Sequence, residues 1–222
     1  MSSIRTILFV FVLCPGLGMS AEHVVNIDTE TEIRLLVFTP NNSGDGPWPL
    51  ALLIPAGSGQ EFILRSQFWL GKELTDRGWV IAVPISRDGN SVFGEDNKDV
   101  SKVISQLQTD PNIKIGKSLL LGISRGGTSA LEIASKNPGN YFGVVAVPGR
   151  LKESGPLPAL QGLPIFLRIA DRDNFRWHKR LPEMTQRLES AGARVDAALV
   201  ENARHIFRIN WDELEPWLNS LK

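Results

Sequence analysis

Apolar and polar positions along the chain predict an alternation of strands and helices. Short continuous apolar runs are typical of strands buried on both faces, whereas apolar residues at helical spacing predict amphipathic helices. The runs that predict strands are residues 24–27, 33–38, 50–54, 79–83, 118–121, 144–147, 165–169 and 195–200. The segments that predict helices are residues 61–77, 96–107, 128–136, 181–191 and 209–221. This order predicts an α/β fold with one mostly parallel sheet covered by helices on both faces.

Composition places the chain among ordinary globular proteins. Its 222 residues are 42% hydrophobic and 22% charged, which excludes intrinsic disorder and a protein with many membrane spans. The 24 basic side chains balance the 24 acidic ones, and no run of like charge stands out. We therefore expect no nucleic-acid partner, because binding to a phosphate backbone requires clustered positive charge.

The first twenty residues have the pattern of a secretory signal peptide. Arg5 precedes the apolar run 7–13, and small residues follow up to Ala21. The run is too short for a span of about 20 residues, so cleavage is favoured over a retained anchor. We expect a signal peptide over residues 1–20 and a single domain over 21–222. The mature protein is then periplasmic or secreted, with no stable membrane insertion.

Cysteine usage restricts the chemistry of the mature chain. Cys14 is the only cysteine and lies inside the predicted signal peptide. A disulfide, a cysteine zinc site and a thiol nucleophile are therefore not expected after cleavage. The sequence also lacks zinc and calcium motifs, so we expect neither a metal nor a cofactor.

A Gly-x-Ser-x-Gly motif lies between a predicted strand and a predicted helix. Ser124 is its serine, with Gly122 and Gly126 on either side. A sharp turn from strand to helix would project the Ser124 hydroxyl above the sheet, and only residues without bulk fit beside it. The amide of Arg125 would open the helix and face a developing oxyanion.

A serine nucleophile requires a base and an acid from elsewhere in the chain. His205 follows the last predicted strand and is the best placed histidine. Asp171 and Asp173 both follow the strand over residues 165–169, at the edge where open α/β sheets gather functional loops. Glu153 is a weaker third candidate for the acid. The order serine, aspartate, histidine is that of the α/β-hydrolase triad.

These motifs resemble the α/β-hydrolase superfamily, in particular its small dienelactone-hydrolase-like and esterase members without a large lid domain. In those proteins a small residue and two variable residues precede the acid, so Ala170 favours Asp173. The family histidine often stands in Gly-x-Gly-His-x-Phe, of which residues 203–207 keep the histidine and the aromatic residue. The oxyanion loop usually begins with His-Gly. Residues 55–59 take that place as Pro-Ala-Gly-Ser-Gly, and the resemblance implies Gly57 as the second amide donor.

Together these features predict an exported serine hydrolase that cleaves an ester through an acyl-enzyme. We expect a small-molecule or carbohydrate-linked ester as substrate, with Trp177 as a candidate wall of the acyl pocket. Two alternatives use the same residues. One is a hydrolase-fold protein that binds a ligand without turnover, since fold does not determine function. The other is a peptidase or thioesterase with the same triad.

Overall fold

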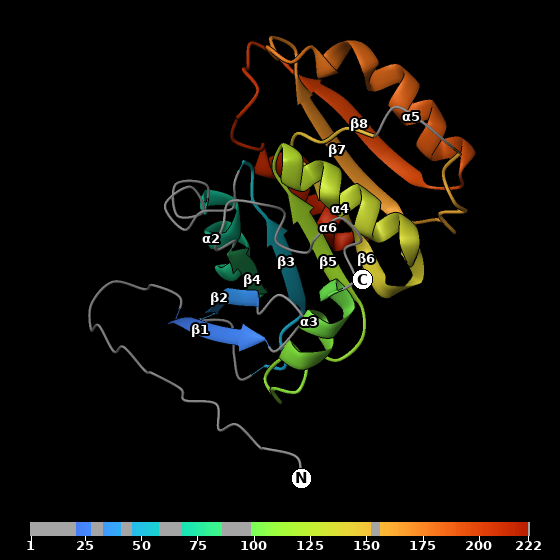
Figure 1. Ribbon diagram of the computed structural model, residues 1–222. Helices are drawn as coiled ribbons and strands as arrows, with labels where there is room; N and C mark the ends of the chain where they lie inside the picture. The colour runs from blue at the N-terminus through green and yellow to red at the C-terminus, as the bar shows by residue number, and fades with distance from the viewer. Residues whose placement is uncertain are drawn as a thin grey trace.

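An eight-stranded sheet forms the centre of the computed structural model, which describes residues 21–27, 33–40, 46–57, 68–85, 99–151 and 156–221 (Figure 1). The strands in chain order are β1 (Ala21–Ile27), β2 (Ile33–Thr39), β3 (Leu50–Ile54), β4 (Val80–Ile85), β5 (Ser118–Gly122), β6 (Tyr141–Ala146), β7 (Pro164–Ala170) and β8 (Arg194–Val200). Their order in space is β1-β2-β4-β3-β5-β6-β7-β8. β2 pairs antiparallel with β1 and β4, and the other pairs are parallel. The predicted signal peptide lies outside the described residues and stays a prediction.

Helices cover both faces of the sheet, as the sequence predicts. The α-helices in the described residues are α2 (Trp69–Thr75), α3 (Asp99–Leu107), α4 (Arg125–Lys136), α5 (Leu181–Ser190) and α6 (Trp211–Asn219). One apolar core joins α3, α4 and α5 to one face, and a second joins α2 and α6 to the other. β3, β4 and β5 are buried at every position, which explains their continuous apolar runs.

Several element boundaries differ from the predicted ranges, and glycines explain the starts of α4 and β6. The apolar pattern places the start of α4 at Thr128, because Gly126 and Gly127 are poor helix formers, whereas the Gly-x-Ser-x-Gly motif places it at Arg125, where the structure has it. β6 begins at Tyr141 rather than Val144, because Gly143 interrupts the apolar run. A Cβ on Gly143 would lie 2.9 Å from the Trp217 ring and 2.8 Å from the Pro164 carbonyl oxygen. Tertiary contacts therefore require a glycine inside this strand.

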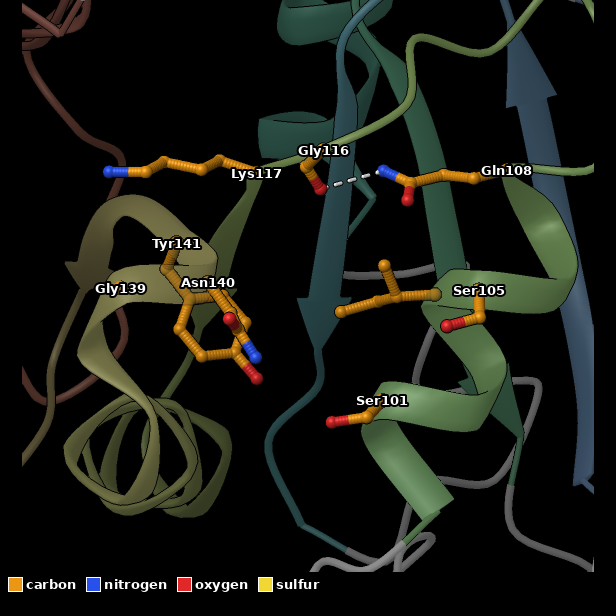
Figure 2. A pocket seen from close by; sticks show the side chains of 9 residues that line it. Ser101, Ser105, Gln108, Gly116, Lys117, Gly139, Asn140 and Tyr141 are labelled. Carbon is orange, nitrogen blue, oxygen red and sulfur yellow. Dashed lines mark hydrogen bonds between the residues drawn. The ribbon is translucent and has the colours of Figure 1, made fainter.

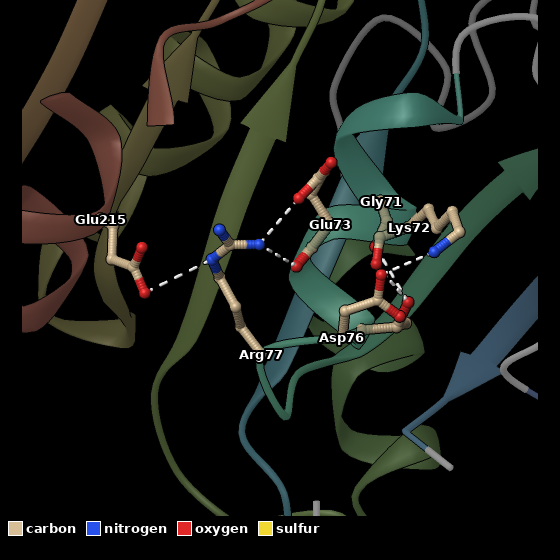
Figure 3. Close-up of polar contacts among 7 residues, drawn as sticks. Gly71, Lys72, Glu73, Asp76, Arg77 and Glu215 are labelled. Carbon is tan, nitrogen blue, oxygen red and sulfur yellow. Dashed lines mark hydrogen bonds and ion pairs between the residues drawn. The ribbon is translucent and has the colours of Figure 1, made fainter. Parts of the chain in front are cut away.

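Arg77 joins the two helices of one face (Figure 3). It lies just beyond α2, where its guanidinium pairs with Glu73 at 2.8 Å and with Glu215 of α6 at 3.5 Å. The same guanidinium lies 4.1 Å from the centre of the Trp211 ring. These contacts link the end of α2 to α6 at the surface. Within the described ranges, no helix combines the length and apolar character that crossing a bilayer requires.

Candidate functional site: a serine, a histidine and an aspartate at one edge of the sheet

Ser124 lies in a strained turn between β5 and α4. Its backbone has φ 57° and ψ −114°, a positive φ that non-glycine residues rarely adopt and that costs about 1–3 kcal/mol. Backbone hydrogen bonds hold the turn on both sides. The Ile123 amide donates to the Ile54 carbonyl at 3.1 Å, and the Ser124 amide donates to the Pro148 carbonyl at 2.8 Å. The strained backbone is therefore supported by its neighbours.

The glycines of the motif allow this close packing. A Cβ on Gly122 would lie 2.2 Å from the Gly126 carbonyl oxygen. A Cβ on Gly126 would lie 2.0 Å from the Ile54 carbonyl oxygen and 2.6 Å from that of Pro55. Real Cβ atoms do not approach backbone oxygens so closely, so no other residue fits at either position without a backbone shift. This geometry agrees with the predicted elbow.

His205 and Asp173 meet Ser124 from two other strand ends. β5, β7 and β8 are parallel, so the loops that follow them lie at the same edge of the sheet. Ser124 Oγ lies 2.7 Å from His205 Nε2, and His205 Nδ1 lies 3.1 Å from Asp173 Oδ2. The structure thus brings together the three side chains that the sequence predicts as a triad.

Burial and hydrogen bonding determine which nitrogen of His205 carries the proton. The Asp173 side chain is 0% exposed and that of His205 is 10% exposed. The second Asp173 oxygen, Oδ1, accepts the Phe175 amide at 2.7 Å. An ionised carboxylate only accepts hydrogen bonds, so a neutral His205 donates from Nδ1 and leaves Nε2 free to accept the Ser124 hydroxyl proton.

Asp171, the other candidate acid, faces the loop after β8 rather than the imidazole. Its carboxylate accepts the backbone amides of Asn202 at 3.0 Å and Ala203 at 3.2 Å. These amides, the Asn202 amide above all, hold the pKa of Asp171 below its usual value. The contact with His205 belongs to Asp173. Glu153, the third candidate, lies outside the described residues.

The two predicted oxyanion donors lie on segments that meet at the elbow. Arg125 is the first residue of α4, where an amide has no acceptor within the helix. Gly57 has φ 69° and follows Pro55, whose carbonyl oxygen is part of the close packing against Gly126. Ser58 and Gly59 lie outside the described residues. The role of both amides stays a prediction and belongs to the proposal below.

Two aromatic side chains lie against His205, and the sequence predicts only one of them, Trp177, near the site. The Trp177 ring centre lies 4.9 Å from that of His205, and the Phe175 ring centre lies 4.6 Å from it, both edge to face. Trp177 therefore touches the site, while a role in binding an acyl group stays a prediction. The sequence does not predict Phe175 at the site, and the only signal for it is its position two residues after Asp173, in a loop at this edge of the sheet.

A cavity of about 320 Å³ lies at the opposite end of the sheet (Figure 2). Lys117 directly precedes β5 and Tyr141 opens β6, so this cavity is at the amino ends of the strands whose carboxyl ends carry the site. Its lining residues are Ser101, Ile104, Ser105, Gln108, Gly116, Lys117, Gly139, Asn140 and Tyr141. The triad is not among them. Across the described residues, no cluster of three or more His, Cys, Asp or Glu side chains could hold a metal ion.

Solved structures share this fold at low sequence identity. The S-formylglutathione hydrolase from Agrobacterium tumefaciens superposes with a TM-score of 0.73 at 12% identity, over 96% of this chain and 99% of that one. The Bacillus cereus carboxylesterase superposes with a TM-score of 0.67 at 16% identity, over 86% of this chain and 95% of that one. Dipeptidyl peptidase 4 from Porphyromonas gingivalis gives 0.68 at 13%, over 91% of this chain and 35% of that one. No curated protein sequence matches the chain. The predicted α/β-hydrolase fold is confirmed, and the described residues contain no large lid domain.

A sequence model of the dienelactone hydrolase family matches residues 87–215. The matched region includes all three residues of the predicted triad. It also covers more than half of the 222 residues. The expectation of a hydrolase that acts on esters is confirmed, and the chain belongs to the dienelactone hydrolase family.

Proposed function

We propose that the protein is an exported serine esterase that cleaves a small-molecule or carbohydrate-linked ester through an acyl-enzyme. The observation that carries the proposal is the 2.7 Å contact between Ser124 Oγ and His205 Nε2. A serine hydroxyl is a weak nucleophile at neutral pH, and an imidazole at this distance can take its proton as the oxygen attacks. Export is supported by the pattern of residues 1–20 alone.

In the first half of the reaction, Ser124 Oγ attacks the ester carbonyl carbon while its proton moves to His205 Nε2. Asp173 stabilises the resulting imidazolium through the Nδ1 hydrogen bond of 3.1 Å. The amides of Gly57 and Arg125 donate to the carbonyl oxygen, which becomes negatively charged. The bond between carbon and the alcohol oxygen then breaks, and the alcohol leaves with the proton from Nε2.

In the second half, water replaces the alcohol. His205 takes a proton from water, and the hydroxyl attacks the acyl carbon bound to Ser124. The acyl bond breaks, Ser124 Oγ recovers its proton from Nε2, and the carboxylic acid leaves. Proton transfer at one nitrogen serves both halves, so a single fixed orientation of His205 is sufficient.

A second candidate function is ligand binding without turnover. Its support is the loop over residues 55–57, where Pro55 and Ala56 stand in place of the His-Gly that is usual in the superfamily. If Gly57 does not donate to the oxyanion, the triad would lack part of its electrostatic stabilisation. The triad geometry is also compatible with peptide or thioester cleavage, so these bonds belong in the substrate panel.

The test is Ser124→Ala, assayed with p-nitrophenyl acetate. We expect kcat to fall by about three orders of magnitude or more, because triad residues act as a unit. Ser135→Ala is the matched control, since Ser135 lies in α4, the helix that follows Ser124, and its hydroxyl donates to the backbone carbonyl of Glu132. A fluorophosphonate should label the wild type and Ser135→Ala, but not Ser124→Ala. If Ser124→Ala retains half the activity, or the wild type is not labelled, the proposal is wrong.

A further inference from the structure

Two exposed apolar residues lie next to His205, Phe175 by ring contact and Ile206 in the sequence. Phe175 is 61% exposed although its ring contacts His205, and Ile206, which directly follows His205, is 46% exposed. The other large apolar residues exposed in the described part of the chain are Val24, Ile115 and Leu199. Exposed apolar surface beside a reactive group is well placed to be covered by the substrate of that group.

Phe175 is well placed to contact a bound ester. Its ring centre is 4.6 Å from that of His205, whose Nε2 is 2.7 Å from the attacking oxygen. A group attached to the reacting carbonyl therefore lies within reach of the exposed surface of this ring. The backbone of the same residue is held by the Asp173 carboxylate, which receives its amide at 2.7 Å. The position of Phe175 is thus fixed by a direct hydrogen bond to Asp173.

Neighbouring contacts favour a flat ring as the occupant. Phe175, Trp177 and His205 already contact one another, with ring centres 4.6–6.1 Å apart. Trp177 is half-buried and also carries the Arg150 guanidinium 5.6 Å from its ring centre. Aromatic rings prefer edge-to-face or offset partners at such distances, and this preference adds to the gain from apolar burial.

We propose that Phe175 forms a subsite that binds the aromatic ring of an ester substrate. This inference rests on the proposed function and narrows it to esters with a ring on the acyl or the alcohol side. Phe175 is then a specificity-determining residue. The competing explanation is that its ring only positions His205, in which case its loss slows every ester equally.

The experiment compares Phe175→Ala with the wild type on four esters, with acid release followed by titration. Methyl acetate has no large group, methyl hexanoate has a flexible chain, methyl benzoate has an acyl ring and phenyl acetate has a ring on the alcohol. Each ester is compared between variants, so differences in intrinsic reactivity cancel. We expect the kcat/KM of at least one ring ester, relative to methyl acetate, to fall about tenfold, which corresponds to about 1.4 kcal/mol.

The remaining outcomes overturn the proposal. An equal fall for all four esters shows that Phe175 positions His205, and no change shows that it binds nothing. A fall for methyl hexanoate as large as for the ring esters shows an apolar surface without ring preference. Ile115→Ala is the control, because Ile115 is 80% exposed on the loop before β5, at the opposite end of that strand from Ser124. Fluorophosphonate labelling of the wild type separates failure of this subsite from failure of the esterase proposal.

Discussion

The Asp171 carboxylate accepts the Ala203 amide at 3.2 Å and so joins the loop that carries Asp173 to the loop that carries His205. Asp171 lies two residues before Asp173, and Ala203 lies two residues before His205. The Arg172 amide returns a hydrogen bond to the Ala203 carbonyl at 3.1 Å. The distance between Asp173 and His205 therefore depends on the Asp171 side chain, which contacts neither of them in the hydrogen bonds described.

Asp171→Ala should lower kcat, because the Asp171 carboxylate holds the loop that carries His205. Without the carboxylate, the loop that carries His205 loses two hydrogen bonds, and small displacements of catalytic groups are costly. We expect kcat to fall about ten- to a hundredfold, with a smaller change in KM. Asp110→Ala is the matched control, because Asp110 accepts the Asn112 amide at 2.8 Å in a turn that follows α3. Equal kcat values for the two variants would exclude a positioning role.

Asp171 should make the free energy of unfolding depend on pH in the acidic range. The pKa of Asp171 is lower in the folded state than in the unfolded chain. Its contribution to stability is therefore present above the unfolded pKa of about 4 and is lost as pH falls through the folded pKa. Urea unfolding of the wild type below about pH 4 should show this loss. Asp171→Ala should lack that part of the pH dependence.

Asp173→Asn should abolish most of the activity while leaving the fold intact. The amide has nearly the same shape, but its NH₂ group cannot accept the Nδ1 proton, so His205 no longer has a stable orientation and tautomer. We expect kcat to fall by about three to four orders of magnitude. Thermal unfolding checks the fold. Substantial activity in this variant would point to another acid.

Gly126→Ala should destabilise the protein through backbone collision. The new Cβ would lie 2.0 Å from the Ile54 carbonyl oxygen, so β3 and the elbow must separate. We expect a loss of about 1–3 kcal/mol or more, seen as a Tm lowered by several degrees. Gly139→Ala is the control, because a Cβ there has no atom within 4 Å. A Tm unchanged in Gly126→Ala would contradict the packing described.

Tyr141 should titrate at unusually high pH. Burial raises its pKa to about 12, and it is the only tyrosine, so the tyrosinate absorbance reports on it alone. In denaturant the midpoint should return to about 10. Because the folded pKa is the higher one, stability is fully present below the unfolded pKa and is lost as pH rises toward 12. Tyr141→Phe should lack this loss of stability. A titration midpoint of the native protein close to that of the denatured protein would contradict the prediction.

Patterns in the sequence predict most of the sheet and the triad because both depend on local signals. Strands buried on both faces, such as β3 and β5, appear as continuous apolar runs. Ser124 has a motif in the required context, and the chain order then indicates His205. The choice of Asp173 over Asp171 needs the resemblance to the superfamily, and the structure supports it through the contact with His205.

The features that the sequence does not predict depend on contacts between distant segments. The apolar pattern alone misses the start of α4, because Gly126 is a poor helix former, and only the Gly-x-Ser-x-Gly motif indicates it. The Ile54 carbonyl leaves no room for a residue other than glycine at position 126. The start of β6 is not predicted because Gly143 interrupts the apolar run. The structure explains this glycine, since a Cβ at residue 143 would lie too close to the Trp217 ring. Phe175 is an ordinary loop residue in the sequence, and only the approach of His205 from another strand end gives it a place in the site.

Close packing of Gly126 against Ile54 and Pro55 has a consequence for how this protein can vary. The nucleophile turn and the loop that carries Gly57 touch through main-chain atoms, so their separation does not depend on which side chains the loop displays. Different side chains at residues 55 and 56 would therefore leave this main-chain contact beside Ser124 in place. Pro55 and Ala56 are therefore compatible with the contacts that join Ser124, His205 and Asp173.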